Sequence, residues 1–240
     1  MRNMLNNPKI EGSNIIDCIP QIGDCPIKCQ ECYYNSPTFY RINTTPLIPT
    51  LEEVGDKIVR VNSGHDSNIN KPFVLEVTKQ YSKKFYNTSL PGFDFPSPVV
   101  FTCNGKYTDT GVLIVIKNLH NLMYVRFRTN TWNIDLLEYA IKYYALENKI
   151  PITLTFMRYK DEKNIPIAHL DNYEYKKHIL NSYFEIKQAV KQKIWYKYSY
   201  LMPLVGMCGT LTSNYCKDCR RCEWAYAQSM NCNLKEFPGQ

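Results

Sequence analysis

Apolar residues along this chain occur in short runs that polar and turn-forming residues separate. Six of the runs are rich in β-branched or aromatic residues and are bounded by Gly, Pro, Asn or Ser, which is typical of buried strands. The expected strands cover residues 14–19, 57–62, 99–103, 123–128, 152–157 and 198–205.

Between these runs, apolar residues recur three or four positions apart, which is the period of a helix with one buried face. The expected helices cover residues 72–87, 134–148 and 171–191. Thr50 and Glu53 have the spacing of a capping box and predict a short helix after Thr50. Residues 108–117 have the composition of a strand where a connecting helix is needed, so their state stays open.

Strands and helices therefore alternate about six times along the chain. Connections of this length favour parallel pairing with right-handed crossovers. We expect an α/β fold, with a partial (β/α)6 TIM-like barrel over residues 1–205 and a C-terminal cysteine-rich segment over residues 206–240. In α/β barrels the functional site forms at the carboxyl ends of the strands.

The chain has 240 residues, of which 44% are apolar, and this is enough for one sizeable core. No apolar run is long enough to cross a membrane, and the first ten residues are too polar for a secretion signal. We therefore expect a cytoplasmic protein without a membrane partner. Ten cysteines in a reducing compartment indicate metal or redox chemistry rather than disulfides.

The formal net charge of +7 favours anionic partners, nucleic acid included, through long-range attraction. Lys and Arg are nevertheless scattered along the chain and form no dense basic block. A solvated basic surface is the more common explanation of such a pattern. An anionic or macromolecular substrate is compatible with this charge, but the charge alone does not identify one.

Three cysteines fall within eight residues: Cys25, Cys29 and Cys32, with three and then two residues between them. A loop of this spacing can gather its sulfurs around one soft metal centre, and thiolates favour iron–sulfur clusters, zinc or copper(I). Zinc normally has a fourth nearby ligand, but the next cysteine is Cys103. Three local ligands describe a cluster with one open iron, and a structural zinc knuckle or a chance spacing is the alternative.

This C-x3-C-x2-C motif resembles that of the radical S-adenosylmethionine (SAM) enzymes. The resemblance implies a partial barrel and a [4Fe–4S] cluster on the three cysteines, with SAM on the fourth iron. It implies reductive cleavage of SAM to a 5′-deoxyadenosyl radical that abstracts a hydrogen from a substrate, and an electron donor such as a flavodoxin or ferredoxin. The combination of this N-terminal loop with the Ser63-Gly64-His65-Asp66 turn and a C-terminal group of cysteines also resembles small, uncharacterised, phage-encoded radical SAM-like proteins.

The resemblance also suggests where the base of SAM lies. The family usually has an aromatic residue just before the third cysteine, where this chain has Glu31. Tyr33 and Tyr34 follow the motif and are the candidates to pack on the adenine ring.

After the second strand the family has a Gly-Gly-Glu-like turn, and its counterpart here is Ser63-Gly64-His65-Asp66. Gly64 permits close approach of the backbone to a ligand. Asp66 is the candidate to accept from the ammonium group of SAM, and His65 could donate to its carboxylate. A polar turn that merely ends a strand is the alternative.

Two further candidates follow later strands. Asn104 stands after the third expected strand and Arg128 at the end of the fourth, where both could contact SAM or a substrate. Arg126 alternates with Arg128 on the same strand but lies farther from its end, and Arg158 follows the fifth expected strand. Both could also bind an anionic group, although each is as plausible in a surface ion pair. Cys18 and Cys103 are expected to be small buried apolar side chains; they are not among the candidate ligands.

The second cysteine-rich stretch contains Cys216, Cys219 and Cys222 in the spacing C-x2-C-x2-C, which resembles ferredoxin cluster loops. Such loops take a fourth cysteine from elsewhere, and Cys208 is preferred over Cys232 because it follows the last strand. We expect an auxiliary [4Fe–4S] cluster, and a four-thiolate zinc site is the competitor.

Two other functional classes compete with the radical enzyme. A zinc-binding module that contacts nucleic acid would use both cysteine groups and the basic charge, but the chain lacks clustered basic residues with interleaved aromatics. A ferredoxin-like electron carrier would not need a barrel of this size.

Overall fold

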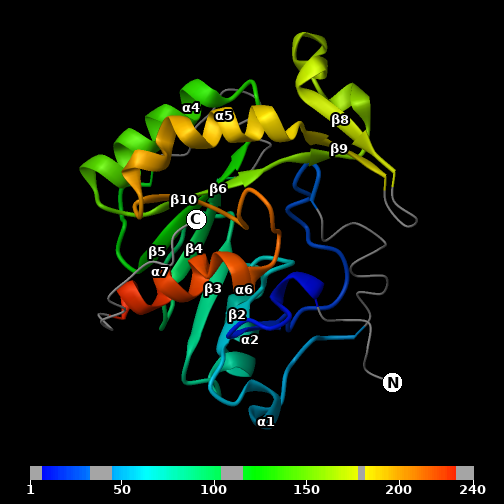
Figure 1. Cartoon of the computed structure of the whole chain (residues 1–240). Coiled ribbons are helices and arrows are strands. Elements are labelled where there is room, and N and C mark those ends of the chain that lie inside the picture. The colour runs from blue at the N-terminus through cyan, green and yellow to red at the C-terminus, as the bar shows by residue number, and fades with distance from the viewer. Residues whose placement is uncertain (1–6, 33–44, 104–115, 178–181, 231–240) are drawn as a thin grey trace.

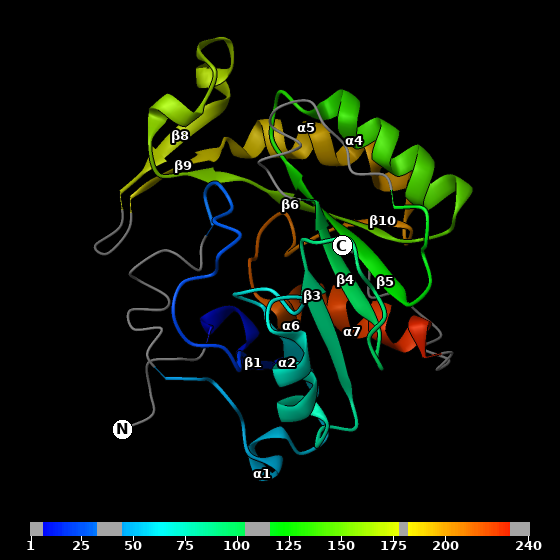
Figure 2. The same cartoon turned by 180° about the vertical axis from the view of Figure 1, so that it is seen from behind.

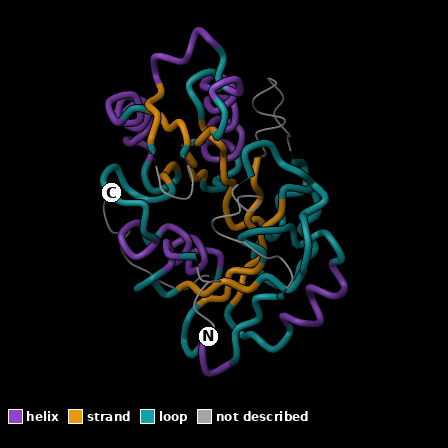
Figure 3. Tube along the Cα trace, turned by 90° about the vertical axis from the view of Figure 1, so that its right-hand side faces the viewer, coloured by secondary structure: helices purple, strands orange, loops and turns teal. Residues whose placement is uncertain are grey.

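The computed structural model describes residues 7–32, 45–103, 116–177 and 182–230. Seven parallel strands form one sheet in which each strand lies beside its neighbours in sequence (Figure 1). Across the sheet these are β1 (Ile15–Cys18), β2 (Ile58–Val61), β3 (Lys84–Thr88), β4 (Val99–Cys103), β5 (Leu122–Thr129), β6 (Ile152–Phe156) and β10 (Val205–Met207). The strands follow a C-shaped curve (Figure 3), so the sheet is a half-barrel with β1 and β10 at its edges, consistent with a partial TIM-like fold.

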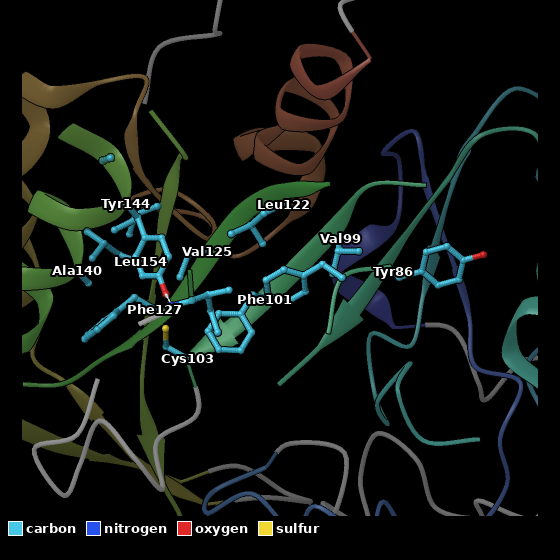
Figure 4. Close-up of a cluster of buried hydrophobic side chains, with 14 of the residues drawn as sticks. Tyr86, Val99, Phe101, Cys103, Leu122, Val125, Phe127, Ala140, Tyr144 and Leu154 are labelled. Atoms are coloured by element: carbon cyan, nitrogen blue, oxygen red, sulfur yellow. Dashed lines mark hydrogen bonds between the residues drawn. The ribbon is translucent and has the colours of Figure 1, made fainter. Parts of the chain in front are cut away.

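The outer face of the half-barrel carries the main apolar core. It is covered by α2 (Lys71–Thr78), α4 (Ile134–Ala140), the π-helical η3 (Ile141–Glu147) and α5 (Gln188–Tyr198) (Figure 2). Figure 4 shows strand side chains gathered beside Tyr144 of η3, with Cys103 among them. Successive strand residues point to opposite faces, so the alternate residues of the same strands line the inner face.

The inner face is filled by both ends of the described chain. The short η1 (Pro8–Ile10) and α7 (Arg221–Ser229) pack against the strands, and Trp224 contributes to this second core. Its apolar members are Ile10, Ile15, Phe85, Val100, Met123, Tyr124, Trp224, Ala225 and Tyr226. The expected boundary between residues 205 and 206 falls inside β10, and the residues after it fold back into the half-barrel.

A small three-stranded antiparallel sheet projects from the carboxyl ends of the parallel strands (Figure 1). It contains β7 (Arg158–Tyr159), β9 (Tyr183–Ile186) and β8 (Tyr173–Lys176), with η4 (Glu162–Asn164) and η5 (Ile167–Asn172) between them in sequence. Its own core includes Met157, Tyr159 and Tyr173. Further short elements are α1 (Leu51–Val54), η6 (Ser199–Leu201) and α6 (Cys216–Cys219).

Five of the six expected strands are confirmed, as β1, β2, β4, β5 and β6. The expected capping box also exists, because Thr50 Oγ1 accepts from the Glu53 N–H at 3.2 Å and Thr50 N–H donates to the Glu53 carboxylate at 2.8 Å. The helix expected over residues 134–148 is present as α4 and η3. Of the ambiguous range 108–117, residues up to 115 lie outside the described residues.

The helix expected over residues 72–87 is wrong beyond Thr78, because residues 84–88 form β3. Phe85 packs in the inner core and Tyr86 in the outer core, which is the alternation of a strand buried on both faces. Apolar residues at positions 74, 77, 81 and 85 fit a helical period as well, so the pattern alone misassigned this stretch. The half-barrel gains a seventh strand as a result.

The helix expected over residues 171–191 is also wrong. This stretch contains η5, β8 and β9, and α5 begins only at Gln188. The strand expected over residues 198–205 is displaced, since α5 runs to Tyr198 and β10 starts at Val205. Strand pairing within the small sheet overrides the weak helical pattern here. No helix in the described segments is long and apolar enough to cross a lipid bilayer.

Candidate metal centres

The first cysteine group, residues 25–32, forms a loop after β1 that we call the cysteine loop. It consists of two consecutive turns, closed by hydrogen bonds from the Lys28 N–H to the Cys25 carbonyl at 3.3 Å and from the Cys32 N–H to the Cys29 carbonyl at 3.2 Å. Cys25 is buried and packs in one small apolar cluster with Cys32. Burial raises the pKa of the Cys25 thiol to about 11, and the charges of Asp66, Cys29 and Cys32 act in the same direction. Cys29, Cys32 and Asp66 of the turn after β2 therefore lie within electrostatic range of the Cys25 thiol.

Two long-range contacts hold the cysteine loop over the carboxyl ends of the strands. Arg128, at the end of β5, donates through Nη2 to the backbone carbonyls of Gln30 at 2.7 Å and Glu31 at 3.3 Å. The Glu31 carboxylate accepts from the Lys160 N–H at 3.0 Å and from Asn164 Nδ2 at 2.5 Å. Glu31 has a φ of 51°, which costs a residue with a Cβ roughly 1–2 kcal/mol, and these two bonds offset that strain.

The Ser63–Asp66 turn lies at the carboxyl end of β2 as the sequence predicts, and Asp66 ties it to β3. Its Oδ1 accepts from Thr88 Oγ1 at 2.8 Å and from the Asn68 N–H at 2.9 Å, and its Oδ2 accepts from the Ser89 N–H at 2.6 Å. Burial raises the pKa of Asp66, while these three hydrogen bonds act to lower it. Asp66 thus supports the turn, and Arg128 the cysteine loop, whether or not either also contacts a ligand.

Three buried amide oxygens around this turn accept no hydrogen bond within the described part of the chain: Gln21 Oε1, Asn62 Oδ1 and Asn87 Oδ1. Their orientation is defined for two of them. Gln21 Nε2 donates to the carbonyls of Asp66 and Ile69, and Asn87 Nδ2 donates to the carbonyl of Val61 at 2.8 Å. The amide oxygens of Gln21 and Asn87 must therefore face away from those carbonyls. The turn is thus surrounded by hydrogen-bond acceptors.

The second group, which we call the cysteine arc, consists of Cys208, Cys216, Cys219 and Cys222. Cys208 directly follows β10, and its N–H donates to the Leu154 carbonyl at 2.8 Å. The other three lie on α6 and in the first turn of α7. Burial raises the pKa of Cys216 to about 12 and that of Cys219 to about 11, and in both cases the charges of Cys208 and Cys222 add to the effect. Cys208 and Cys222 therefore lie within electrostatic range of both Cys216 and Cys219.

Basic side chains surround the cysteine arc. Arg60 on β2 forms a buried bidentate pair with Asp17 on β1, at 2.6 and 3.1 Å, and lies within electrostatic range of Cys216 and Cys222. Arg221 is buried at the start of α7 and donates to Thr153 Oγ1 at 3.1 Å and to carbonyls of β6 and of the segment before β10. The Tyr124 hydroxyl lies 3.3 Å from the Cys222 sulfur.

Neither group is arranged as a finished metal site: among the described residues, no three or more Cys, His, Asp or Glu side chains are placed to hold a metal ion. The raised thiol pKa values mean that Cys25, Cys216 and Cys219 carry protons in the metal-free chain at neutral pH. Metal binding would release these protons and draw the thiolates together. The candidates Tyr33, Tyr34, Asn104 and Cys232 lie outside the described residues.

Cys18 and Cys103 are buried in the outer core, as the sequence predicts for small apolar side chains. The sequence interpretation did not find Asp17 and Arg60. A signal for both existed, since each is the single charged residue of an apolar strand. These two positions pair directly in the register of β1 and β2.

No protein-family model, no curated protein and no solved structure matches this chain.

Proposed function

We propose that the protein is a radical SAM enzyme that binds a [4Fe–4S] cluster through Cys25, Cys29 and Cys32. The observation that carries the proposal is the placement of this C-x3-C-x2-C loop. It stands at the carboxyl ends of a parallel half-barrel, where α/β barrels form their sites, and Arg128 at the end of β5 holds it there through hydrogen bonds to its backbone. Three cysteine ligands leave one iron of a cluster open for SAM.

The surroundings of the cysteine loop fit a positively charged ligand group. SAM carries an ammonium group that needs several acceptors, and Asp66 with the amide oxygens of Gln21, Asn62 and Asn87 supplies them beside Cys25. Ser63, Gly64 and His65 belong to the same turn. When bound, the cluster and SAM would supply a 5′-deoxyadenosyl radical after one electron arrives from a donor such as a flavodoxin or ferredoxin.

The chain itself contributes orientation and the exclusion of water. The cysteine loop covers the strand ends, and η1 and α7 close the opposite part of the inner face. Arg126 on β5 points to the same face as Tyr124 and donates to its hydroxyl at 3.1 Å and to Thr102 Oγ1 at 3.4 Å. A substrate between the cysteine loop and the cysteine arc would meet this guanidinium group.

The cysteine arc is proposed to bind a second, auxiliary [4Fe–4S] cluster. Cys208 and Cys222 interact electrostatically with Cys216 and Cys219, and the buried Arg60 and Arg221 would balance the negative charge of four thiolates. Cys208 is preferred as the fourth ligand because its charge interacts with both Cys216 and Cys219. A zinc ion on the same four thiolates is the alternative that metal analysis separates.

The experiment compares the anaerobically purified wild type with the triple variant Cys25→Ala, Cys29→Ala, Cys32→Ala. The wild type should show a cluster EPR signal that changes when SAM is added, and it should form 5′-deoxyadenosine under reduction. The triple variant should lose both responses and retain about four iron atoms per chain, those of the arc.

Cys103→Ala is the matched control, because it removes a buried cysteine of the outer core and should leave both responses intact. Zinc without iron in the reconstituted wild type would refute the proposed activity.

A further inference from the structure

The inner face of β5 carries a tyrosine that contacts the cysteine arc. The Tyr124 hydroxyl lies 3.3 Å from the Cys222 sulfur, although the two residues are 98 positions apart in sequence. Tyr124 is 1% exposed and belongs to the inner core together with Trp224 and Ala225 of α7, and Cys222 packs against the same core. The packing of α7 on the half-barrel therefore fixes this contact and shields the hydroxyl from water.

Arg126, two residues further along the same face of β5, leaves the hydroxyl proton of Tyr124 for Cys222. Its Nη2 donates to the Tyr124 oxygen at 3.1 Å, and its Nη1 donates to Thr102 Oγ1 at 3.4 Å. A guanidinium group can only donate, so the Tyr124 oxygen accepts from Arg126 and its single proton stays available for another acceptor. The Cys222 sulfur is an acceptor within reach of that proton.

Metal binding decides which partner donates in this contact. A cysteine binds a metal as a thiolate, which has no proton and can only accept a hydrogen bond. When Cys222 is a ligand of the arc, Tyr124 must therefore be the donor. Such a bond withdraws electron density from the sulfur and favours the more reduced state of the centre, and hydrogen bonds to ligand sulfurs are among the factors that set the reduction potential of iron–sulfur clusters.

The two buried arginines near the arc act differently. The hydrogen bonds described above for Arg60 and Arg221 go to oxygen atoms, of Asp17, Thr153 and backbone carbonyls. The contact of Tyr124 goes to a sulfur atom of the arc itself. A substitution of Tyr124 can thus change the hydrogen bonding of the arc without changing the charge around it.

We propose that Tyr124 is a positioning residue of the cysteine arc: its hydroxyl, held by Arg126, donates to the Cys222 sulfur and raises the reduction potential of the bound centre. Tyr124 keeps its proton in both oxidation states, so the only transfer is one electron from the external donor to the centre. The effect on a potential rests on the proposed auxiliary [4Fe–4S] cluster. The hydrogen bond to a metal-bound Cys222 does not.

The test uses the full-length triple variant of the cysteine loop defined above, reconstituted anaerobically, so that only the arc contributes to the signal. Adding Tyr124→Phe removes the hydroxyl and keeps the ring, and it should disfavour reduction about tenfold, which is about 59 mV for one electron. An EPR-monitored redox titration measures the midpoint potential, and the iron content should stay at about four per chain. Tyr86→Phe is the matched control, because it removes a buried hydroxyl of the outer core and should leave the potential unchanged.

Arg126→Met tests the group that holds the hydroxyl. It should lower the potential as well, and it should add less than its single effect when it is combined with Tyr124→Phe, because it acts through that hydroxyl. Fully additive effects would show that Arg126 acts by its charge alone and would remove it from the proposal.

An unchanged potential in Tyr124→Phe would overturn the proposal. A loss of iron in that variant would also overturn it, because Tyr124 would then support metal binding or folding. Zinc in the arc in place of iron would refute the proposed auxiliary cluster instead, and cobalt(II) substitution then tests the hydrogen bond. A shift of the sulfur-to-cobalt charge-transfer band between Tyr124→Phe and its parent would support the bond, and identical spectra would overturn it.

Discussion

The two cysteine groups of this half-barrel use the same ligand chemistry in opposite electrostatic surroundings. The cysteine loop lies beside the buried carboxylate of Asp66, and three buried amide oxygens around the same turn accept no hydrogen bond from any described residue. The cysteine arc lies beside Arg60, Arg221, Lys9 and Lys191. The half-barrel therefore places acceptors at the carboxyl ends of β1–β3 and cations deeper on the inner face and at its edge.

This difference indicates different partners for the two groups. Surroundings rich in acceptors favour a ligand with donors and positive charge, such as the ammonium group of an amino acid. Cationic surroundings favour four thiolates on one metal centre, whose net charge is negative. Under the proposed function, the cysteine loop would hold the exchangeable cofactor and the cysteine arc a permanently bound centre.

The largest expected effect sharpens this comparison at the arc. Cys216→Ala should remove the iron of the auxiliary centre and leave the SAM-dependent EPR change of the cysteine loop. The iron content and the EPR spectra with and without SAM measure the two centres separately. If Cys216→Ala instead abolishes the response to SAM, the two groups are not independent centres.

Two further variants identify the fourth cysteine ligand of the proposed auxiliary centre. Cys208→Ala should lower the iron content as Cys216→Ala does, whereas Cys232→Ala should not, because Cys208 interacts electrostatically with Cys216 and Cys219. The reverse result would move the fourth ligand to Cys232.

The second-largest effect concerns the stability contributed by the buried ion pair of Arg60 and Asp17. Arg60→Met should lower the free energy of unfolding by about 3–5 kcal/mol, because it leaves the Asp17 carboxylate buried and unpaired. Urea denaturation of the metal-free protein measures this loss. The double variant Arg60→Met, Asp17→Asn should recover most of it, and a double variant as unstable as the single one would show that Arg60 acts through packing rather than charge.

The smallest effect concerns Asp66. Asp66→Ala leaves three donors without their acceptor, so we expect it to lower the free energy of unfolding by at least about 2 kcal/mol and to weaken SAM binding roughly tenfold. Thr88→Val is the control, since it removes one donor and keeps the carboxylate. Equal SAM affinity in the two variants would restrict Asp66 to a supporting role.

The same carboxyl predicts a pH dependence. Burial raises the pKa of Asp66, so the folded chain holds this proton more tightly than the unfolded chain does. The stability contributed by this group therefore increases as the pH falls through the folded-state pKa of Asp66 toward its lower, unfolded-state pKa. The stability difference between the wild type and Asp66→Ala should widen on mild acidification, and a difference that narrows would contradict the burial of this charge.

What the sequence alone determined is local. The capping box of Thr50 and Glu53, the five correctly expected strands and the spacing of both cysteine groups depend on residues that are close in sequence. Even this local information was ambiguous over residues 74–85, where the apolar positions fit the period of a helix as well as that of a strand. Residues 84–88 form the strand β3 because they pair with β2 and β4 in the folded chain.

What surrounds each cysteine group was decided by the tertiary structure. Arg60 meets Asp17 across 43 positions, Arg128 holds the cysteine loop across 98, and Glu31 reaches the small antiparallel sheet across 129. No local pattern encodes such contacts, because they exist only once the curved sheet brings its strands and both chain ends onto one inner face. The cysteine spacing specified which side chains could bind a metal, and the packing of the half-barrel specified the charge around them.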